Sequence, residues 1–133
     1  MQLRDWLIRD EGLRYKPYKD SVGKITIGVG RNLTDVGLSL EEIYYLLEND
    51  IERCKGQLIS YSWYTKQPPG VKDALINMCF NLGLEGLLAF RTMIRLLDKG
   101  KYQDAAEAAL DSSWAKQVPE RAKQITHAIA LGK

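Results

Sequence analysis

The sequence predicts a predominantly helical α+β fold: a small antiparallel β-sheet lobe joined by a long helix to a helical lobe, with a cleft between the lobes. Three observations predict it. Apolar residues alternate through KITIGVG, residues 24–30, as in a strand with one apolar face. A capping motif at Ser39 opens a long stretch of helical periodicity. The segment GVKDALINMCFNLG, residues 70–83, is apolar on most sides, which is typical of a central helix.

The front of the chain is expected to form the sheet lobe, over residues 13–38, after a short helix. Apolar residues recur at helical spacing in residues 3–11, and Gly12 follows as a helix stop. The segment SVGK predicts a turn before the strand. On the strand, one face is expected to carry Ile25, Ile27 and Val29 and the other to carry Lys24 and Thr26.

The rest of the chain is expected to be helical. The SLEE motif is a capping box that starts a connecting helix over residues 39–60. A proline-containing break precedes the central helix, which Gly83 is expected to close, and three further helical segments follow. The helical lobe would span residues 68–133 and pack with the helix at 3–11. At 133 residues, the whole chain, 1–133, fits one domain.

Composition excludes several classes of protein. The net charge of +2 and pI of about 8.5, with no helix carrying a basic stripe, argue against a nucleic-acid partner. No run reaches the roughly eighteen apolar residues of a membrane span, and the N-terminus has no signal-peptide core. We therefore expect no stable membrane insertion and synthesis in the cytoplasm. His127 is the only histidine, so neither a metal nor a cofactor is expected. Cys54 and Cys79 are expected as buried free thiols, and their pairing stays open.

The chemistry lies in the opening stretch, RDEGLRYKPYKDSVGKITIGVG, residues 9–30. Glu11 would end a helix, where the negative end of the dipole disfavours the ionised form of an acid. Asp20 would lie in an open turn and stay ionised. Such a pair suits cleavage of a glycosidic bond, with one acid giving a proton to the leaving oxygen and the other activating water. Thr26 could reach Asp20 or a water, although strand threonines usually reflect β-propensity alone.

Two glycines, Gly28 and Gly30, interrupt the same strand. Glycine weakens a strand unless something must approach the backbone closely, and a polymer lying in a groove would be such a partner. The phosphate-loop alternative fails, because neither the GxxxxGK[ST] lysine nor a GxGxxG motif followed by a helix is present.

These residues give the chain a specific resemblance. In EGLRYKPYKDSVGKITIGVGRNLT, eight residues separate Glu11 from Asp20 and five residues separate Asp20 from Thr26. FNLG at residues 80–83 and WAKQVPERA at 114–122 add to the pattern. Nearly the whole chain, in order, resembles the phage-type lysozymes, the family of the T-even phage enzyme.

The resemblance implies a muramidase that cleaves the β-1,4 bond between N-acetylmuramic acid and N-acetylglucosamine in peptidoglycan. Glu11 would be the general acid, Asp20 the partner carboxylate and Thr26 the residue that holds the nucleophilic water, with inversion at the anomeric carbon. A phage endolysin of this kind would act as a monomer in host cell lysis. It would be made in the host cytoplasm and reach the wall with the help of a separate holin-like protein.

The resemblance also implies supporting residues. Arg121 would pair with the acid. Substrate-binding positions would be Gly30, Asn32, Phe80, Asn81 and Gln117. Three positions depart from the family pattern: Arg31 replaces the histidine of the best-known member, with no acidic partner identifiable, and Met93 and Ala108 stand where small polar residues line the cleft. Contacts with the peptide stems therefore stay open.

Two alternatives accompany this interpretation. A lytic transglycosylase would use the acid but needs no water-holding pair, so the presence of both Asp20 and Thr26 counts against it. A non-catalytic wall-binding module would be expected to have lost one of the three polar residues, and all three are present.

Overall fold

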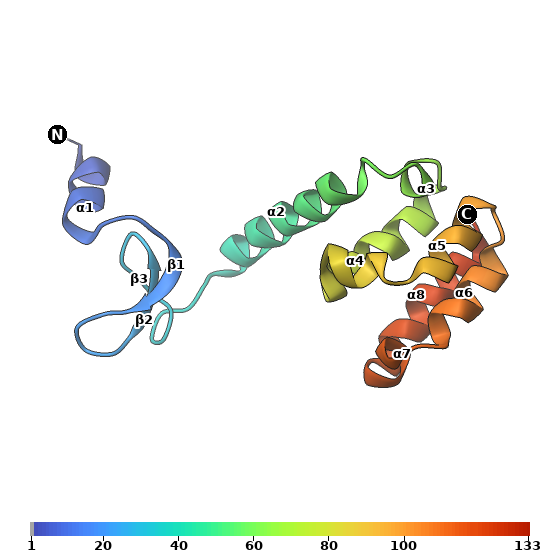
Figure 1. Cartoon of the computed structure of the whole chain (residues 1–133). Coiled ribbons are helices and arrows are strands. Elements are labelled where there is room, and N and C mark those ends of the chain that lie inside the picture. The colour runs from blue at the N-terminus through green and yellow to red at the C-terminus, as the bar shows by residue number, and fades with distance from the viewer. Residues whose placement is uncertain (1) are drawn as a thin grey trace. The chain divides into compact units, whose positions relative to one another are not determined.

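The computed structural model describes residues 2–133 and confirms the predicted α+β class (Figure 1). The chain divides into two compact units, one ending at Leu46 and the other formed by Leu47–Lys133. The first unit contains helix α1 (Leu3–Glu11) and strands β1 (Arg14–Lys19), β2 (Ile25–Gly28) and β3 (Arg31–Asn32).

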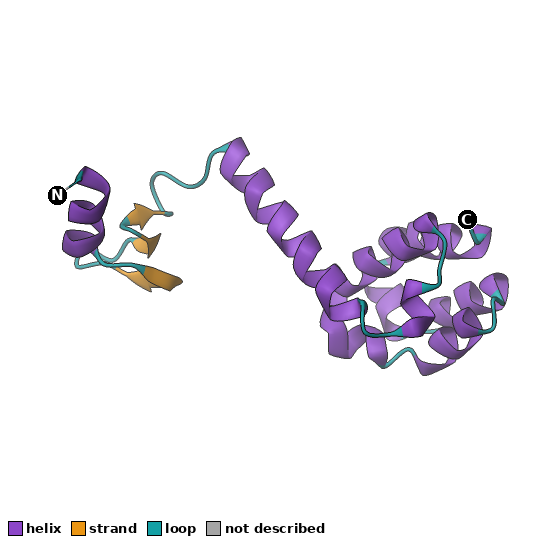
Figure 2. Ribbon diagram, turned by 90° about the horizontal axis from the view of Figure 1, so that it is seen from above, coloured by secondary structure: helices purple, strands orange, loops and turns teal. Residues whose placement is uncertain are grey.

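The strands of the first unit, drawn in orange in Figure 2, form an antiparallel sheet in the order β1-β2-β3. Tyr18 lies opposite Thr26 in the first pairing, and Thr26 lies opposite Asn32 in the second. The register shifts between Arg14 and Tyr18, as at a β-bulge. Thr26 therefore occupies the central strand with a neighbour on each side.

Helix α2 (Leu40–Leu58) begins where the capping motif predicts. Glu42 N donates to Ser39 Oγ at 3.1 Å, and Ser39 N donates to Glu42 Oε1 at 2.9 Å. The two bonds form the reciprocal capping box, which satisfies two backbone donors that a helix start leaves without partners.

The second unit is helical and contains α3 (Ser62–Thr65), α4 (Pro69–Leu88), α5 (Arg91–Asp98), α6 (Tyr102–Leu110), α7 (Ser113–Gln117) and α8 (Pro119–Leu131). Helix α8 packs against α4, α6 and α7, and α5 packs against α3 and α6. The core includes Leu58, Val71, Leu75, Met78, Leu87, Met93, Leu97 and Ile129. Helix α4 supplies four of these side chains, as its apolar sequence predicts.

The predicted end of the central helix at Gly83 is confirmed, although helical structure resumes beyond it. Gly83 (φ 76°, ψ 166°) leaves helical geometry, so the first segment of α4 ends there, and a second segment follows the kink and continues to Leu88. Only a residue without a side chain adopts that conformation readily. The short helices α3 and α7 were not predicted, since four or five residues give too little periodicity to detect.

The thiols and the long helices complete the description. Cys54 and Cys79 are free and buried, as predicted. Among residues 2–133, no single helix combines the length and the hydropathy needed to cross a membrane; α4 and α5 meet that test only when joined across a 100° bend.

Candidate active site

Glu11 is the last residue of α1, as predicted. The helix ends because Gly12 takes a positive φ of 81°, and its N–H donates to Ile8 O at 2.8 Å. The Glu11 side chain is exposed to solvent but lies along the backbone of Gly30. A Cβ built on Gly30 would be 3.0 Å from Glu11 Oε2. The acid at the end of the helix is thereby brought to the turn between β2 and β3.

Asp20 shapes the turn between β1 and β2. Its N–H donates to Lys24 O at 2.9 Å, and its Oδ1 accepts from Val22 N at 3.0 Å and from Lys24 N at 2.8 Å. Among the side-chain hydrogen bonds of residues 2–133, those to Asp20 use Oδ1. Oδ2 is therefore available to a water or a ligand.

Thr26 is almost completely buried, with 4% of its surface exposed. Its hydroxyl donates to Lys24 O at 3.1 Å, rather than to Asp20. The donated hydrogen leaves the lone pairs of Oγ1 free to accept a hydrogen bond from water.

The predicted faces of the strand were wrong in one respect. The face expected to be apolar is partly open, with Ile25 37% and Val29 38% exposed. Val29 lies outside the strand, because β2 ends at Gly28, whose φ of 69° departs from extended geometry. Thr26 is buried because Tyr18 and Asn32 are its directly opposite cross-strand neighbours, and such pairs share a face.

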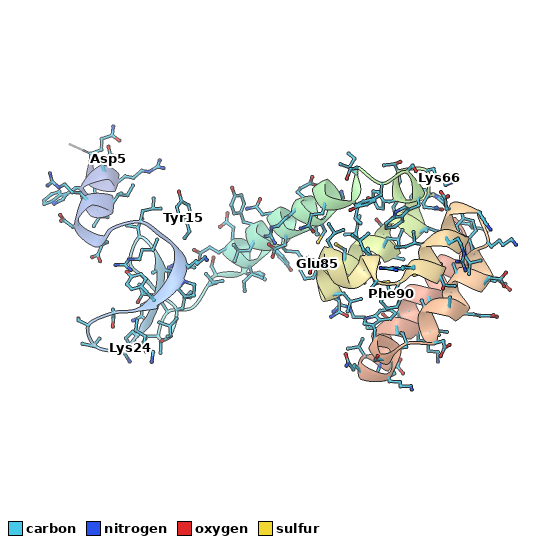
Figure 3. The ribbon with its side chains drawn as sticks, in the orientation of Figure 1. Asp5, Tyr15, Lys24, Lys66, Glu85 and Phe90 are labelled. Atoms are coloured by element: carbon cyan, nitrogen blue, oxygen red, sulfur yellow. The ribbon has the colours of Figure 1, made fainter. Side chains whose placement is uncertain are left out.

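The backbone of Lys24 joins Asp20 to Thr26. Its N–H donates to the Asp20 carboxylate, and its carbonyl accepts from the Thr26 hydroxyl. Lys24 lies at the β1–β2 turn (Figure 3), and its Nζ pairs with the Asp35 carboxylate at 3.2 Å. The link between Asp20 and Thr26 therefore runs through the Lys24 peptide group and not through its charged side chain.

Asn32, a predicted substrate-binding residue, is bonded within its own turn. Its Nδ2 donates to Asp35 Oδ2 at 3.1 Å, and its Oδ1 accepts from Asp35 N at 2.9 Å. Both ends of the amide are therefore engaged with Asp35. The substrate contact predicted for Asn32 remains a proposal.

Arg31 has an acidic partner that the sequence did not reveal. Its guanidinium binds both oxygens of Glu42, with Nη1–Oε1 at 2.8 Å and Nη2–Oε2 at 2.6 Å. The hydrogen bond from Arg31, followed by the one from Ser39 N, lowers the pKa of Glu42 to about 2. The carboxylate that caps α2 thus also holds the residue that follows the β2–β3 turn.

The candidates of the second unit fall into two groups. Phe80, 44% exposed, and Arg121 line a cavity of about 410 Å³ together with Asn77. Arg121 donates to Asn77 Oδ1 from Nε at 3.0 Å and from Nη2 at 2.8 Å. Gln117 lines a different cavity, of about 470 Å³.

Asn81 belongs with the larger cavity through Trp114. The buried Trp114 donates from Nε1 to Asn81 Oδ1 at 2.8 Å. The indole also meets Phe90 edge-on, with ring centroids 5.7 Å apart, and Phe90 lies where α4 meets α5 (Figure 3). The cavity is lined by Trp114, Phe90, Gln117, Met93 and Ala108, together with polar residues such as Arg91 and Asp111.

The structure brings the front candidates together in one unit. Glu11 contacts Gly30, and Asp20 and Thr26 are linked through one peptide group. Among residues 2–133, no group of three or more His, Cys, Asp or Glu side chains could hold a metal ion.

A three-stranded sheet unit and a helical unit with this constellation define a lysozyme-like α+β protein. Residues 9–127 match the family model described as phage lysozyme. The chain therefore belongs to the phage lysozyme family of peptidoglycan-lysing enzymes.

Individual relatives are consistent with this membership. The chain is 34% identical to an endolysin of Salmonella phage P22, over 78% of this chain and 75% of the relative. It is 28% identical to probable T4-type lysozyme 1 of Dictyostelium discoideum, over 98% of this chain and 94% of the relative. It is also 29% identical to the pre-baseplate central spike protein Gp5 of Enterobacteria phage T4, over 99% of this chain but only 28% of that protein's length.

Proposed function

We propose that the protein is a muramidase that hydrolyses the β-1,4 bond between N-acetylmuramic acid and N-acetylglucosamine in peptidoglycan, with inversion. The observation that carries the proposal is the constellation in the first unit. Glu11 is held against Gly30, and Asp20 and Thr26 share the Lys24 peptide group. An acid and a second carboxylate are the groups that such a hydrolysis requires, and a hydroxyl can hold the attacking water.

In the proposed reaction, Glu11 gives its proton to the oxygen that leaves as the glycosidic C–O bond breaks. A water held by Thr26 adds to the anomeric carbon from the opposite face, and its proton passes to Asp20. One water is consumed for each bond cleaved, and exchange of protons with solvent restores both acids. Inversion requires room for that water, with carboxyl groups roughly 6.5–9.5 Å apart in inverting enzymes.

Each group has a physical basis for its part. Asp20 Oδ1 is fixed by two backbone N–H groups, so Oδ2 can face a water without the carboxylate rotating freely. The Thr26 hydroxyl donates its hydrogen bond to Lys24 O, so its oxygen can accept a hydrogen bond from that water. Glu11 is exposed, as a donor to an external polymer must be.

The wider role is part of the same proposal. The protein would be a single catalytic domain that binds a glycan strand. Arg121 would support the acid, and Gly30, Asn32, Phe80, Asn81 and Gln117 would contact the sugars. It would act as a monomer in phage lysis of the host, passing from the host cytoplasm to the wall with the aid of a holin-like protein.

Glu11→Gln tests the proposal directly. The substitution removes the proton donor with little change in volume, and loss of a general acid typically costs about 10²–10⁴-fold in rate. Release of reducing ends from purified peptidoglycan should fall by at least about 10²-fold. Asp10→Asn, in the same turn of α1, is the matched control and should leave the rate unchanged. Full activity in Glu11→Gln would end the proposal.

Two further measurements separate the alternatives. Asp20→Asn and Thr26→Ala should each lose much of the rate. Mass spectrometry of the released muropeptides distinguishes hydrolysis from a lytic transglycosylase, because anhydro ends are one water lighter than hydrated ends. Binding to walls with no release of sugar by the unaltered protein would instead indicate a non-catalytic wall-binding module.

A further inference from the structure

Gly30 lies at an unusually close approach to the proposed proton donor. A Cβ at this position would meet three atoms of one side chain: Glu11 Oε2 at 3.0 Å, Cδ at 3.2 Å and Cγ at 3.3 Å. Contacts this short require the neighbouring side chain to shift by a few tenths of an ångström. The whole carboxyl end of Glu11 therefore lies along backbone that is open only because residue 30 has no side chain.

The position of Gly30 connects this contact to the rest of the constellation. It lies in the short turn between β2 and β3, whose register is set by the pairs Ile27–Arg31 and Thr26–Asn32. Glu11 belongs to a different element, at the end of α1. The contact with Gly30 thus places the Glu11 carboxyl group beside the turn that follows β2, the strand that carries Thr26.

Gly28 supplies an internal comparison. Both glycines have a φ of 69°, in the left-handed region that disfavours side chains. A Cβ at Gly28, however, would have nothing within 4 Å. The two positions share the same positive φ and differ in the contact with Glu11.

We propose that Gly30 is a positioning residue for catalysis. Because it has no side chain, its backbone leaves the space in which the Glu11 carboxyl group lies, and we call this contact surface the seat of Glu11. A side chain at position 30 displaces the acid from the leaving oxygen without removing it. The catalytic consequence rests on the proposed function of Glu11 as proton donor, whereas the seat itself does not.

The experiment compares Gly30→Ala with Gly28→Ala. Both variants should lose similar thermal stability, since both force alanine into the same left-handed conformation. Gly30→Ala alone should lower kcat on soluble peptidoglycan fragments by at least tenfold, with KM changed less than threefold. Equal kcat values for the two variants would overturn the proposal.

A second readout is independent of activity. The ¹³C chemical shift of the Glu11 carboxyl carbon should change in Gly30→Ala and stay near that of the unaltered protein in Gly28→Ala. A changed shift together with full activity in Glu11→Gln would keep the seat and reject its catalytic use. An unchanged shift in Gly30→Ala would reject the seat itself.

A substitute pair covers the case in which the alanine variants do not fold. Asparagine tolerates a left-handed φ better than alanine does. Gly30→Asn and Gly28→Asn should then show the same contrast in kcat and in the Glu11 shift, and the absence of a contrast would again count against the proposal.

Discussion

The bond between Asn81 and Trp114 offers a way to separate structural support from substrate binding. Asn81 Oδ1 accepts the Trp114 indole N–H at 2.8 Å, and only 5% of the Trp114 surface is exposed. Asn81→Ala removes the acceptor and leaves a buried donor without a partner. Such a loss costs about 1–3 kcal/mol, and Asn81 is itself exposed, so water entry favours the lower half of this range.

The measurement is the free energy of unfolding from chemical denaturation. Asn81→Asp is the matched control, because it keeps the acceptor and should keep most of the stability. A double-mutant cycle isolates the bond: in a Trp114→Phe background, which has no N–H to satisfy, Asn81→Ala should cost much less than in the unaltered protein. An equal cost in both backgrounds would show that the bond does not carry the stability of this region.

The same variants test the proposed substrate role of Asn81. Because its oxygen is engaged with Trp114, a contact with sugar would come from Nδ2. Asn81→Asp lacks that donor and should raise KM on peptidoglycan while the protein stays folded. If KM is unchanged in this variant, Asn81 acts by holding Trp114 at the wall of the cavity and not by binding substrate.

Two further predictions concern titrating groups. Glu42 has a folded pKa of about 2 against an ordinary value of 4.5, so its contribution to stability is complete above pH 4.5 and is lost as pH falls towards 2. The unfolding temperature of Glu42→Gln should therefore lie below that of the unaltered protein at pH 7. A difference in unfolding temperature that stays constant down to pH 2 would contradict the lowered pKa of Glu42. Burial, followed by the neighbouring Cys54, raises the pKa of Cys79 to about 11, so the neutral thiol stabilises the fold below its ordinary value of 9.0 and that contribution is lost as pH rises through 11. Ellman's reagent at pH 8 should therefore leave Cys79 unmodified until denaturant is added, and rapid reaction in the native protein would refute this.

Local sequence signals predicted the parts of the fold that depend on neighbouring residues. The end of α1 at Gly12 and the start of α2 at the Ser39–Glu42 box follow from turn and capping chemistry within four residues. The two strand glycines predicted a close approach to the backbone. The structure provides one at Gly30, where the approaching group is Glu11 of the same chain.

Contacts between distant residues were beyond the sequence. Arg31 finds Glu42 eleven residues away, and the pairing depends on the path of the intervening turn. Arg121 meets Asn77 across 44 residues, so only the packing of α8 on α4 brings them together. The burial of Thr26 was mispredicted because alternation gives the faces of a strand but not which face its neighbours cover.

The peptide group of Lys24 has a consequence for how position 24 can vary. Asp20 and Thr26 are held there by a backbone N–H and a backbone carbonyl, which every residue except proline supplies in full. Substitutions at this position can therefore exchange the half-buried lysine for other side chains while the backbone link between Asp20 and Thr26 persists. Comparing side chains across relatives would overlook the position, and only proline would reveal its importance.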